Sequence, residues 1–433
     1  MRVTRLDSEE VQRRGGPRGA AAHLRSLAPA GASVEAAVRE IVEAIRTRGD
    51  AALLELTRRL DTAGAEPRSL VVDAEELDEA LKAMPLEVVA GLQVTIANVA
   101  LVAQAGVGED TTVALPQGQR VTLREMPVAV AGVYAPGGRA PYPSTVAMGV
   151  VTARAAGVVD VAVCSPPGPN GQIDAAILGT CRLLGVERVY RMGGAQAIAA
   201  LAFGTETVER VDVVVGPGNL YVQEAKRQLS GVVGIDGFAG PSDVMALLGE
   251  DADPRPVALD LLAQAEHGAG SVVAAVAWAP AVLDALAKEI ESLSASGPEV
   301  EPAACLLIEV ADARAAIELA NAFAPEHLEL IGAEPEALAA QVRSAGCVFV
   351  GAAGGTAFGD YVAGSNHILP TAGAARFASG LSARHFRRRM SEVRIDPAGA
   401  TKLAKAGAPI ARAEGFEWHA RSMEARVREN PGS

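Results

Sequence analysis

The chain has 433 residues, of which 49% are hydrophobic, 21% charged and only 3% aromatic, and its formal net charge is −13. This length allows two or more domains of ~100–200 residues each, with cores built mainly from Ala, Val, Leu and Ile. The negative charge argues against nucleic acid or an anionic membrane surface as the main partner.

The start of the chain and the cysteines indicate a compartment. MRVTRLDSEEVQRRGG carries charges but lacks the apolar core of a signal peptide, and we expect no apolar run of the ~20 uncharged residues that span a bilayer. The cysteines form no CxxC pair and no disulfide framework; they are Cys164, Cys181, Cys305 and Cys347. We therefore expect buried free thiols in a cytoplasmic protein.

The elements follow in chain order. Apolar residues recur at helical spacing over the first ~115 residues, for example in VEAAVREIVEAIRTRGDAALLELTRRLD, and a polar, β-prone stretch (TTVALPQGQRVTLREMPV) comes next. From about residue 128, short apolar runs such as VAVAGVYAP alternate with helix-like segments such as YPSTVAMGVVTARAAG. A second alternating series starts near residue 240 and reaches CVFVGAA, and the polar, basic end of the chain closes with a helical segment.

This alternation with short links predicts parallel sheets covered by helices. We therefore expect an α/β fold with two α/β domains built from incomplete Rossmann-like units, an N-terminal helical segment and a small C-terminal tail domain. The main domain is expected to comprise residues 1–127 and 240–380, the inserted α/β domain residues 128–239, and the tail residues 381–433. The basic run RHFRRRM in the tail is more often a solvated face than a binding site.

Five of the six histidines lie between residues 267 and 419, which directs attention to that half of the chain. Gln264 and His267 in LLAQAEHGAG are three residues apart, so on a helix they project from one face. Imidazole nitrogen is a ligand suited to Zn²⁺. The alternative is a polar helix end before a glycine C-cap.

Glu326 and His327 in FAPEHLELIG are an acid and a base at the start of a predicted strand, after Pro325 ends a helix. They could act as a catalytic pair, since histidine titrates near neutral pH and a carboxylate can orient a water molecule. Neighbours on a strand point to opposite faces. Both side chains can serve one site only if the local turn breaks that rule.

Asp360 and His367 lie in GGTAFGDYVAGSNHILPT, a glycine-rich segment that we interpret as a loop after a strand. Long ordered loops at the carboxyl ends of strands often carry sites in α/β proteins, so Asp360 could bind a metal and His367 could face the substrate. The alternative for Asp360 is a turn aspartate that caps its own backbone. Glu414 and His419 are five residues apart and share no simple helical face; His419 alone would more often be a surface histidine.

Two glycine-rich loops, YAPGGRAPYPST and VVGPGNLY, follow predicted strands and could receive a pyrophosphate on their backbone amides. Neither matches GxGxxG with an acidic residue about 20 positions later, so the dinucleotide fingerprint is absent.

Eight segments, taken together and in this order, resemble the histidinol dehydrogenase family over nearly the whole chain. They are YAPGGRAPYPSTVAM, GGAQAIAALAFGT, VVGPGNLYVQEAKR, GIDGFAGPSDVM, LLAQAEHG, PEHLEL, GDYVAGSNHILPT and EGFEWH. Each segment alone is moderately specific, whereas eight in sequence are highly specific.

The resemblance implies a role for each matching residue. One zinc per subunit would be held by Gln264, His267, Asp360 and His419, and the catalytic pair would be Glu326 and His327. Substrate contacts would come from Ser242, Gln264, His267, His327, Asp360, Glu414 and His419. NAD contacts would come from Tyr134, Gln196 and Asn219 in residues 128–239. His367 is a secondary candidate, whereas His23 and His385 match no functional motif.

The resemblance also implies the reaction and the assembly. L-Histidinol would be oxidised through the aldehyde to L-histidine with two NAD⁺ reduced, and the tail of a homodimer would complete the partner's site. One alternative keeps the fold but oxidises another small alcohol, such as a sulfonated diol. Glu414, His419 and Ser242 favour an imidazole-bearing amino alcohol. A zinc-stabilised binding protein without catalysis is the alternative from another class.

Overall fold

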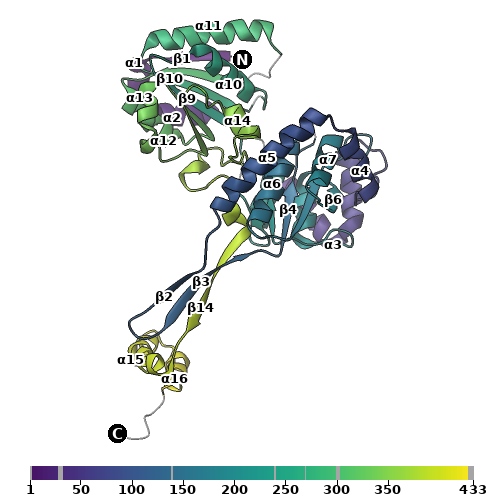
Figure 1. The fold of residues 1–433 in the computed structure, drawn as a ribbon, viewed down its shortest axis with the longest axis vertical. Coiled ribbons are helices and arrows are strands. Elements are labelled where there is room, and N and C mark those ends of the chain that lie inside the picture. The colour runs from purple at the N-terminus through teal and green to yellow at the C-terminus, as the bar shows by residue number, and fades with distance from the viewer. Residues whose placement is uncertain are drawn as a thin grey trace. The chain divides into compact units, whose positions relative to one another are not determined.

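The computed structural model describes residues 2–27, 33–137, 140–237, 240–268, 270–298 and 303–427, and the chain divides into two compact units (Figure 1). The larger unit comprises residues 1–106 and 129–386, and the smaller one comprises residues 107–128 and 387–433. Two parallel sheets covered by helices form the larger unit, which confirms the predicted α/β fold.

The first sheet has six parallel strands in the order β1-β11-β10-β9-β12-β13. These strands are β1 (Arg2–Leu6), β9 (Asp243–Leu248), β10 (Val272–Ala277), β11 (Ala304–Glu309), β12 (His327–Ile331) and β13 (Cys347–Val350). One face packs on α10 (Pro254–Ala265) and α11 (Pro280–Ser296), and the other packs on α1 (Ser8–Arg13), α2 (Gly16–Leu27) and α12 (Ala313–Phe323). Burial on both faces explains why the central strands are continuous apolar runs. The edge strand β1 was not predicted, because Arg2–Leu6 has only two apolar residues and lies within a segment that otherwise has helical spacing.

The second sheet has five parallel strands in the order β6-β5-β4-β7-β8. They are β4 (Val130–Tyr134), β5 (Asp160–Ser165), β6 (Arg188–Arg191), β7 (Val213–Val215) and β8 (Gly234–Ile235), and the helices between them are α6 (Pro143–Ala155), α7 (Ala175–Leu183), α8 (Gly194–Phe203) and α9 (Leu220–Leu229). Counted along the chain from β4, and from β9 in the first sheet, both sheets have the order 3-2-1-4-5. This is the Rossmann order without its sixth strand, as predicted.

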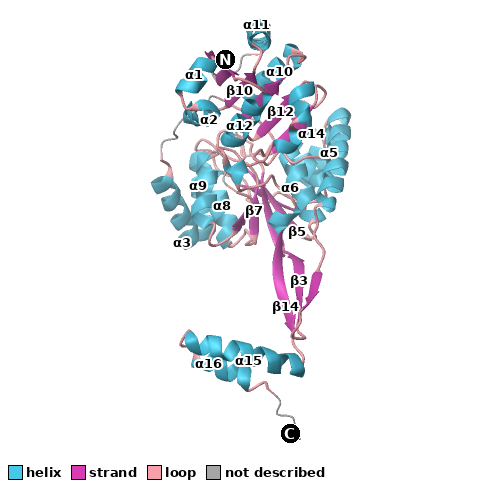
Figure 2. Ribbon diagram, turned by 90° about the vertical axis from the view of Figure 1, so that its left-hand side faces the viewer, coloured by secondary structure: helices cyan, strands magenta, loops and turns pink. Residues whose placement is uncertain are grey.

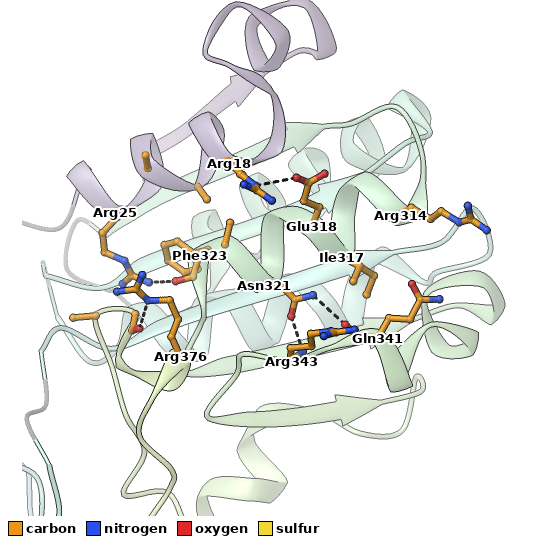
Figure 3. Close-up of a pocket in the computed structure, with 15 residues that line it drawn as sticks. Arg18, Arg25, Arg314, Ile317, Glu318, Asn321, Phe323, Gln341, Arg343 and Arg376 are labelled. Carbon is orange, nitrogen blue, oxygen red and sulfur yellow. Dashed lines mark hydrogen bonds and ion pairs between the residues drawn. The ribbon is translucent and has the colours of Figure 1, made fainter.

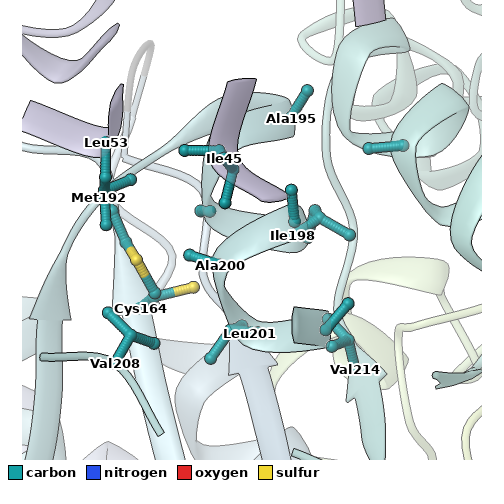
Figure 4. Packing of buried hydrophobic residues seen from close by; sticks show 14 of the residues in the cluster. Ile45, Leu53, Cys164, Met192, Ala195, Ile198, Ala200, Leu201, Val208 and Val214 are labelled. Atoms are coloured by element: carbon teal, nitrogen blue, oxygen red, sulfur yellow. The ribbon is translucent and has the colours of Figure 1, made fainter. Parts of the chain in front are cut away.

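Three helices between residues 35 and 105 pack on the second sheet, not on the first. They are α3 (Glu35–Leu60), α4 (Ala74–Ala83) and α5 (Leu86–Ala105), and they lie against α8, α7 and α6 respectively (Figures 1 and 2). Ile45 and Leu53 of α3 share one core with Ile198 and Leu201 of α8 (Figure 4). The predicted main domain of residues 1–127 and 240–380 is corrected accordingly. An amphipathic helix reveals its apolar face but not which sheet receives that face.

The smaller unit contains an antiparallel sheet in the order β14-β3-β2, followed by two helices. Its elements are β2 (Thr111–Ala114), β3 (Arg120–Pro127), β14 (Arg387–Arg394), α15 (Pro397–Ala413) and α16 (Glu417–Glu424). The predicted β-prone stretch therefore pairs with the tail, and RHFRRRM largely forms an exposed strand. The predicted tail of residues 381–433 gains residues 107–128 and begins at Arg387.

The remaining helical turns are short. They are α13 (Ala333–Ala337), α14 (Thr356–Tyr361) and the 3₁₀ turns η1 (Ala339–Gln341), η2 (Ala374–Arg376) and η3 (Ala383–Phe386). The segment that was interpreted as a loop after CVFVGAA thus contains α14. Three cysteine thiols are free and buried, as expected, and Cys347 is half-buried.

Among the described residues, α5 is the one helix long and apolar enough to cross a membrane by length and composition, with a hydropathy of 1.8. The expectation that no segment reaches that length is therefore corrected. α5 packs against α6 and buries Leu92, Val99 and Ala103. Its outer face exposes Leu86 and Leu101.

Candidate functional site

Glu326 and His327 lie at the amino end of β12, where α12 has just ended at a left-handed Ala324 (φ 53°). Glu326 precedes the strand, so the alternation of faces does not separate the pair. The Glu326 amide donates to Asp243 Oδ1 (2.7 Å), and the Asp243 amide donates to Glu326 Oε2 (3.0 Å). These reciprocal bonds fix the Glu326 carboxyl 3.9 Å from His327 Nδ1.

Asp243 is itself held by an arginine of α2, a helix that packs on the first sheet. Arg25 of α2 donates to Asp243 Oδ2 (2.9 Å) and to the Phe323 carbonyl (2.5 Å), and its guanidinium lies 3.9 Å from the centre of the Phe323 ring. Arg25 lines a hollow of about 940 Å³ together with four other arginines (Figure 3). Asp243, which orients Glu326, is therefore paired with the positively charged Arg25.

Asp360 returns to the same edge through α14. Its Oδ1 lies 3.3 Å from His327 Nε2, although the segment that carries it leaves β13 at the opposite, carboxyl end. A Cβ at Gly359 would come within 2.5 Å of the Phe349 ring, so only glycine lets α14 pass this close to β13. The predicted placement at the carboxyl ends of the strands is therefore corrected for this sheet: its site residues gather at the amino ends.

His367 contacts the same residue from the other side. Its Nδ1 lies 2.9 Å from the Asp360 carbonyl oxygen and its Nε2 lies 2.9 Å from Thr145 Oγ1 of α6. Both ring nitrogens are therefore engaged. His367 therefore links the backbone of Asp360 to α6, which covers the second sheet. Neither of its ring nitrogens is left free to bind a metal.

Burial and neighbouring charges shift the pKa values of this cluster. Burial raises the pKa of Glu326 to about 8. Burial alone would lower the pKa of His327, but the carboxyl groups of Glu326, Asp360 and Asp243 raise it to about 9. Burial alone would raise the pKa of Asp360, but His327, with smaller contributions from His367 and His267, lowers it below its ordinary value. An anionic Asp360 thus faces a base that can hold or release a proton.

Gln264 lies in α10, which ends at Ala265, and His267 follows in the turn beyond it, where its amide donates to the Gln264 carbonyl oxygen (3.2 Å). The Gln264 side chain is buried, and its Nε2 has no hydrogen-bond partner. His267 is exposed yet close enough to influence the pKa of Asp360. His267 and Asp360 are thus close enough to interact, and Gln264 lies three residues before His267.

The predicted cofactor residues lie at the carboxyl ends of the second sheet. Tyr134 ends β4, and its hydroxyl accepts a bond from the Gly194 amide (3.2 Å). Gln196 is buried in α8 and donates to Asp61 (3.2 Å), whereas Asn219 caps α9 and is exposed. β4 and β7 flank the point where the strand order reverses, which is where open α/β sheets bind ligands.

A cavity of about 490 Å³ lies within the larger unit, between the loop after β7 and the segment after His367. Ser242 and Glu326 line it from the first sheet, and Gly216 and Gly218 line it from the second. His23 and His385 do not line it. The cavity therefore joins the predicted catalytic acid to the predicted cofactor end of the second sheet.

Glu414 and His419 lie in the smaller unit, on either side of the break between α15 and α16. Gly415 adopts φ 82° there, so the two residues occupy different helices, in agreement with the prediction that they share no face. Both side chains are exposed, and the His419 ring packs 5.2 Å from that of Phe416.

Several residues that shape the site were not anticipated. Asp243 and Glu329 hold Glu326 and α14, and Asp61 contacts Gln196. Lys226 is buried and bonds Asp236 (2.6 Å) beside the cavity. The sequence could have indicated Asp243 and Glu329, because each is a charged residue within or beside an apolar strand, in PSDVM and HLELIG.

Comparison with known proteins agrees with this architecture. The family model described as histidinol dehydrogenase matches residues 27–427. A histidinol dehydrogenase of Rhizobium meliloti strain 1021 is 42% identical over 413 residues, covering 94% of this chain and 95% of the relative. That of a Synechococcus strain is 44% identical over 400 residues, covering 90% and 92%.

A solved structure extends the likeness to three dimensions. The crystal structure of histidinol dehydrogenase from Elizabethkingia anophelis superposes with a TM-score of 0.90 at 30% identity, covering 98% of this chain and 97% of that one. The relatives are matched over nearly their full lengths. The chain therefore belongs to the histidinol dehydrogenase family and is an oxidoreductase.

Proposed function

We propose that this chain oxidises L-histidinol through L-histidinal to L-histidine, the last steps of histidine biosynthesis, and reduces two NAD⁺ per substrate. In this proposal the enzyme is a cytoplasmic homodimer with one zinc ion per subunit. The observation that carries the proposal is the buried pair of Glu326 and His327, held against Asp360 beside a cavity, in a chain of this family.

The residues present fit a zinc ion with oxygen and nitrogen ligands. Gln264 supplies a buried amide, whose oxygen is the atom that would bind the metal, and Asp360 is held in its anionic form. With His267 and with His419 of the partner subunit they would complete a four-ligand set. Zinc, when bound, would supply a Lewis-acid anchor for the imidazole and amine of the substrate. Within the described ranges of one chain, no three His, Cys, Asp or Glu side chains are grouped so that they could hold a metal ion.

Tyr134, Gln196 and Asn219 would receive NAD⁺ at the reversal point of the second sheet. NAD⁺, when bound, would accept a hydride in each oxidation. The cavity that leads from Gly216 and Gly218 toward Glu326 provides the path between the two sites.

His327 would move the protons of both oxidations. In its deprotonated form, it would take the hydroxyl proton of the alcohol as the neighbouring carbon loses its hydride, which gives the aldehyde. Glu326 would then remove a proton from water as the oxygen attacks the aldehyde carbon, which gives the hydrate. His327 would first release the alcohol proton to solvent and would then take a hydroxyl proton of the hydrate as the second hydride leaves, which gives the carboxylic acid. Positioned proton transfer contributes typically ~10²–10⁴-fold to rate.

The smaller unit supports a dimer in which each tail completes the partner's site. Its described helices bury four alanines and one glycine, its outer strands β2 and β14 are exposed along most of their length, and Trp418 and Phe416 lie open. A sheet and a helical pair with so little buried apolar area are marginal alone. In this proposal Glu414 and His419 act on the substrate and the metal of the other subunit.

Counting NADH formed per L-histidinol consumed by the zinc-loaded protein tests the proposal. Two NADH and one L-histidine per substrate are expected. One NADH with aldehyde released would contradict the second oxidation. No turnover with histidinol, but turnover with another small alcohol such as a sulfonated diol, would replace the substrate.

A further inference from the structure

Two carboxyl groups lie beside the candidate site, one fully buried and one half-buried. Glu329 of β12 is 0% exposed, and Asp260 on α10 is half-buried and close enough to influence the pKa of the Glu329 carboxyl group. Neither residue forms an ion pair with lysine or arginine in the described part of the chain. A fully buried glutamate is rare unless it is paired, so this pair requires an explanation.

The two carboxyl groups lie on or against three elements, and each of these elements carries a candidate site residue. Asp260 lies one turn before Gln264 on α10, so both project from the same side of that helix. Glu329 lies two residues after His327 on β12 and points to the same face of the sheet. The same carboxyl group also reaches the first residue of α14, the helix that carries Asp360.

The contact with α14 replaces a missing helix cap. The N-cap residue is Gly355, which offers no side chain, and the Thr356 amide donates to Glu329 Oε1 (3.1 Å) instead. A Cβ at Gly355 would come within 3.0 Å of Asp260 Oδ1, so both carboxyl groups lie against the start of this helix. An N-terminal amide needs such an acceptor because no earlier turn supplies one.

Two facing carboxyl groups can hydrogen-bond only if one keeps its proton. Glu329 Oε2 is buried and has no hydrogen-bond partner, and a proton on this oxygen would let it donate to the Asp260 carboxyl group. The neutral acid then uses both oxygens, one as acceptor from α14 and the other as donor to α10.

We propose that Glu329 and Asp260 form a carboxyl clasp that fixes α10, β12 and α14 relative to one another and so positions Gln264, His327 and Asp360. The consequence for zinc rests on the proposed function, whereas the anchoring of α14 does not.

Four variants separate the hydrogen bonds from charge and from general destabilisation. Glu329→Gln keeps an acceptor for Thr356 and a donor to Asp260, whereas Glu329→Leu keeps the volume and neither bond. Thr356→Pro removes only the amide donor at a position where helices tolerate proline. Leu330→Ala is the matched control, because Leu330 is buried on the opposite face of the same strand.

Hydrogen exchange of the peptide spanning α14 in the metal-free protein, and zinc affinity by competition with a chelating dye, are the two readouts. Glu329→Leu and Thr356→Pro should lose protection of α14 and weaken zinc binding by about 10–100-fold, as changes to outer-shell partners do. Glu329→Gln and Leu330→Ala should retain both properties.

Unchanged protection of α14 in Glu329→Leu and Thr356→Pro would overturn the clasp. Equal losses in Glu329→Gln and Glu329→Leu would overturn the neutral acid, and equal zinc losses in Leu330→Ala would show that general destabilisation suffices. A wild-type protein that binds no zinc, with the exchange results as expected, would remove the proposed metal centre and leave the clasp standing.

Discussion

The ion pair between Arg25 and Asp243 should contribute measurably to stability. Removing one partner of a buried pair costs about 3–5 kcal/mol. Arg25 retains 27% of its side-chain exposure, so solvent lowers that figure, and we expect Asp243→Asn to lower the free energy of unfolding by about 2–3 kcal/mol. The asparagine keeps an acceptor for the Glu326 amide, so the loss reports mainly on the uncompensated guanidinium.

A double-mutant cycle with Arg25→Met isolates this pair. The second substitution removes the stranded cation, so we expect a coupling of about 2 kcal/mol between the two sites. Urea unfolding is followed by the fluorescence of Trp278, which packs against the core of the first sheet, in a Trp418→Phe background. A coupling free energy below about 0.5 kcal/mol would refute the claim that the ion pair with Arg25 stabilises Asp243.

Three further outcomes are expected. His327→Asn should abolish oxidation of the alcohol, whereas Glu326→Gln should mainly slow oxidation of the aldehyde; equal losses in separate assays with the two substrates would contradict this division. Burial raises the pKa of Asp61 from 3.8 to about 6, so its favourable contribution is complete below about pH 4 and is lost as pH rises through 6. Asp61→Asn, which leaves Gln196 a partner, should therefore match the wild type near pH 4 and exceed its stability by up to about 2–3 kcal/mol above pH 6; a pH-independent difference in urea midpoints would argue against a buried, neutral Asp61. Removing zinc with a chelator should stop oxidation but preserve the circular dichroism spectrum, because the proposed ligands lie at element ends; unfolding on chelation would contradict this placement.

The alternation of apolar runs and helices was sufficient to predict two parallel sheets, because strands buried on both faces leave a clear pattern. It was not sufficient to place the helices of residues 35–105, since amphipathicity is a property of one element and packing depends on two. The pairing of β3 with β14 joins residues about 260 to 274 positions apart, and no local pattern encodes that distance.

The site residues were proposed from the resemblance, and the structure adds how several of them are held. Glu329 between two leucines resembles the solvent-facing position of an alternating strand, yet it is buried. Asp243 precedes an apolar run and resembles a strand-end residue, yet it orients Glu326. In both cases the partner comes from a distant element, and the residue type alone does not distinguish a solvated acid from a buried one.

Mixing two inactive variants tests the shared site most directly. His327→Asn and His419→Ala are each expected to be inactive as homodimers. After they are dissociated together and reassembled, half of the dimers carry one intact site, so about a quarter of wild-type activity should return. No recovery in a mixture shown to contain heterodimers, or full activity of His419→Ala alone, would contradict the proposal that each tail completes the site of its partner.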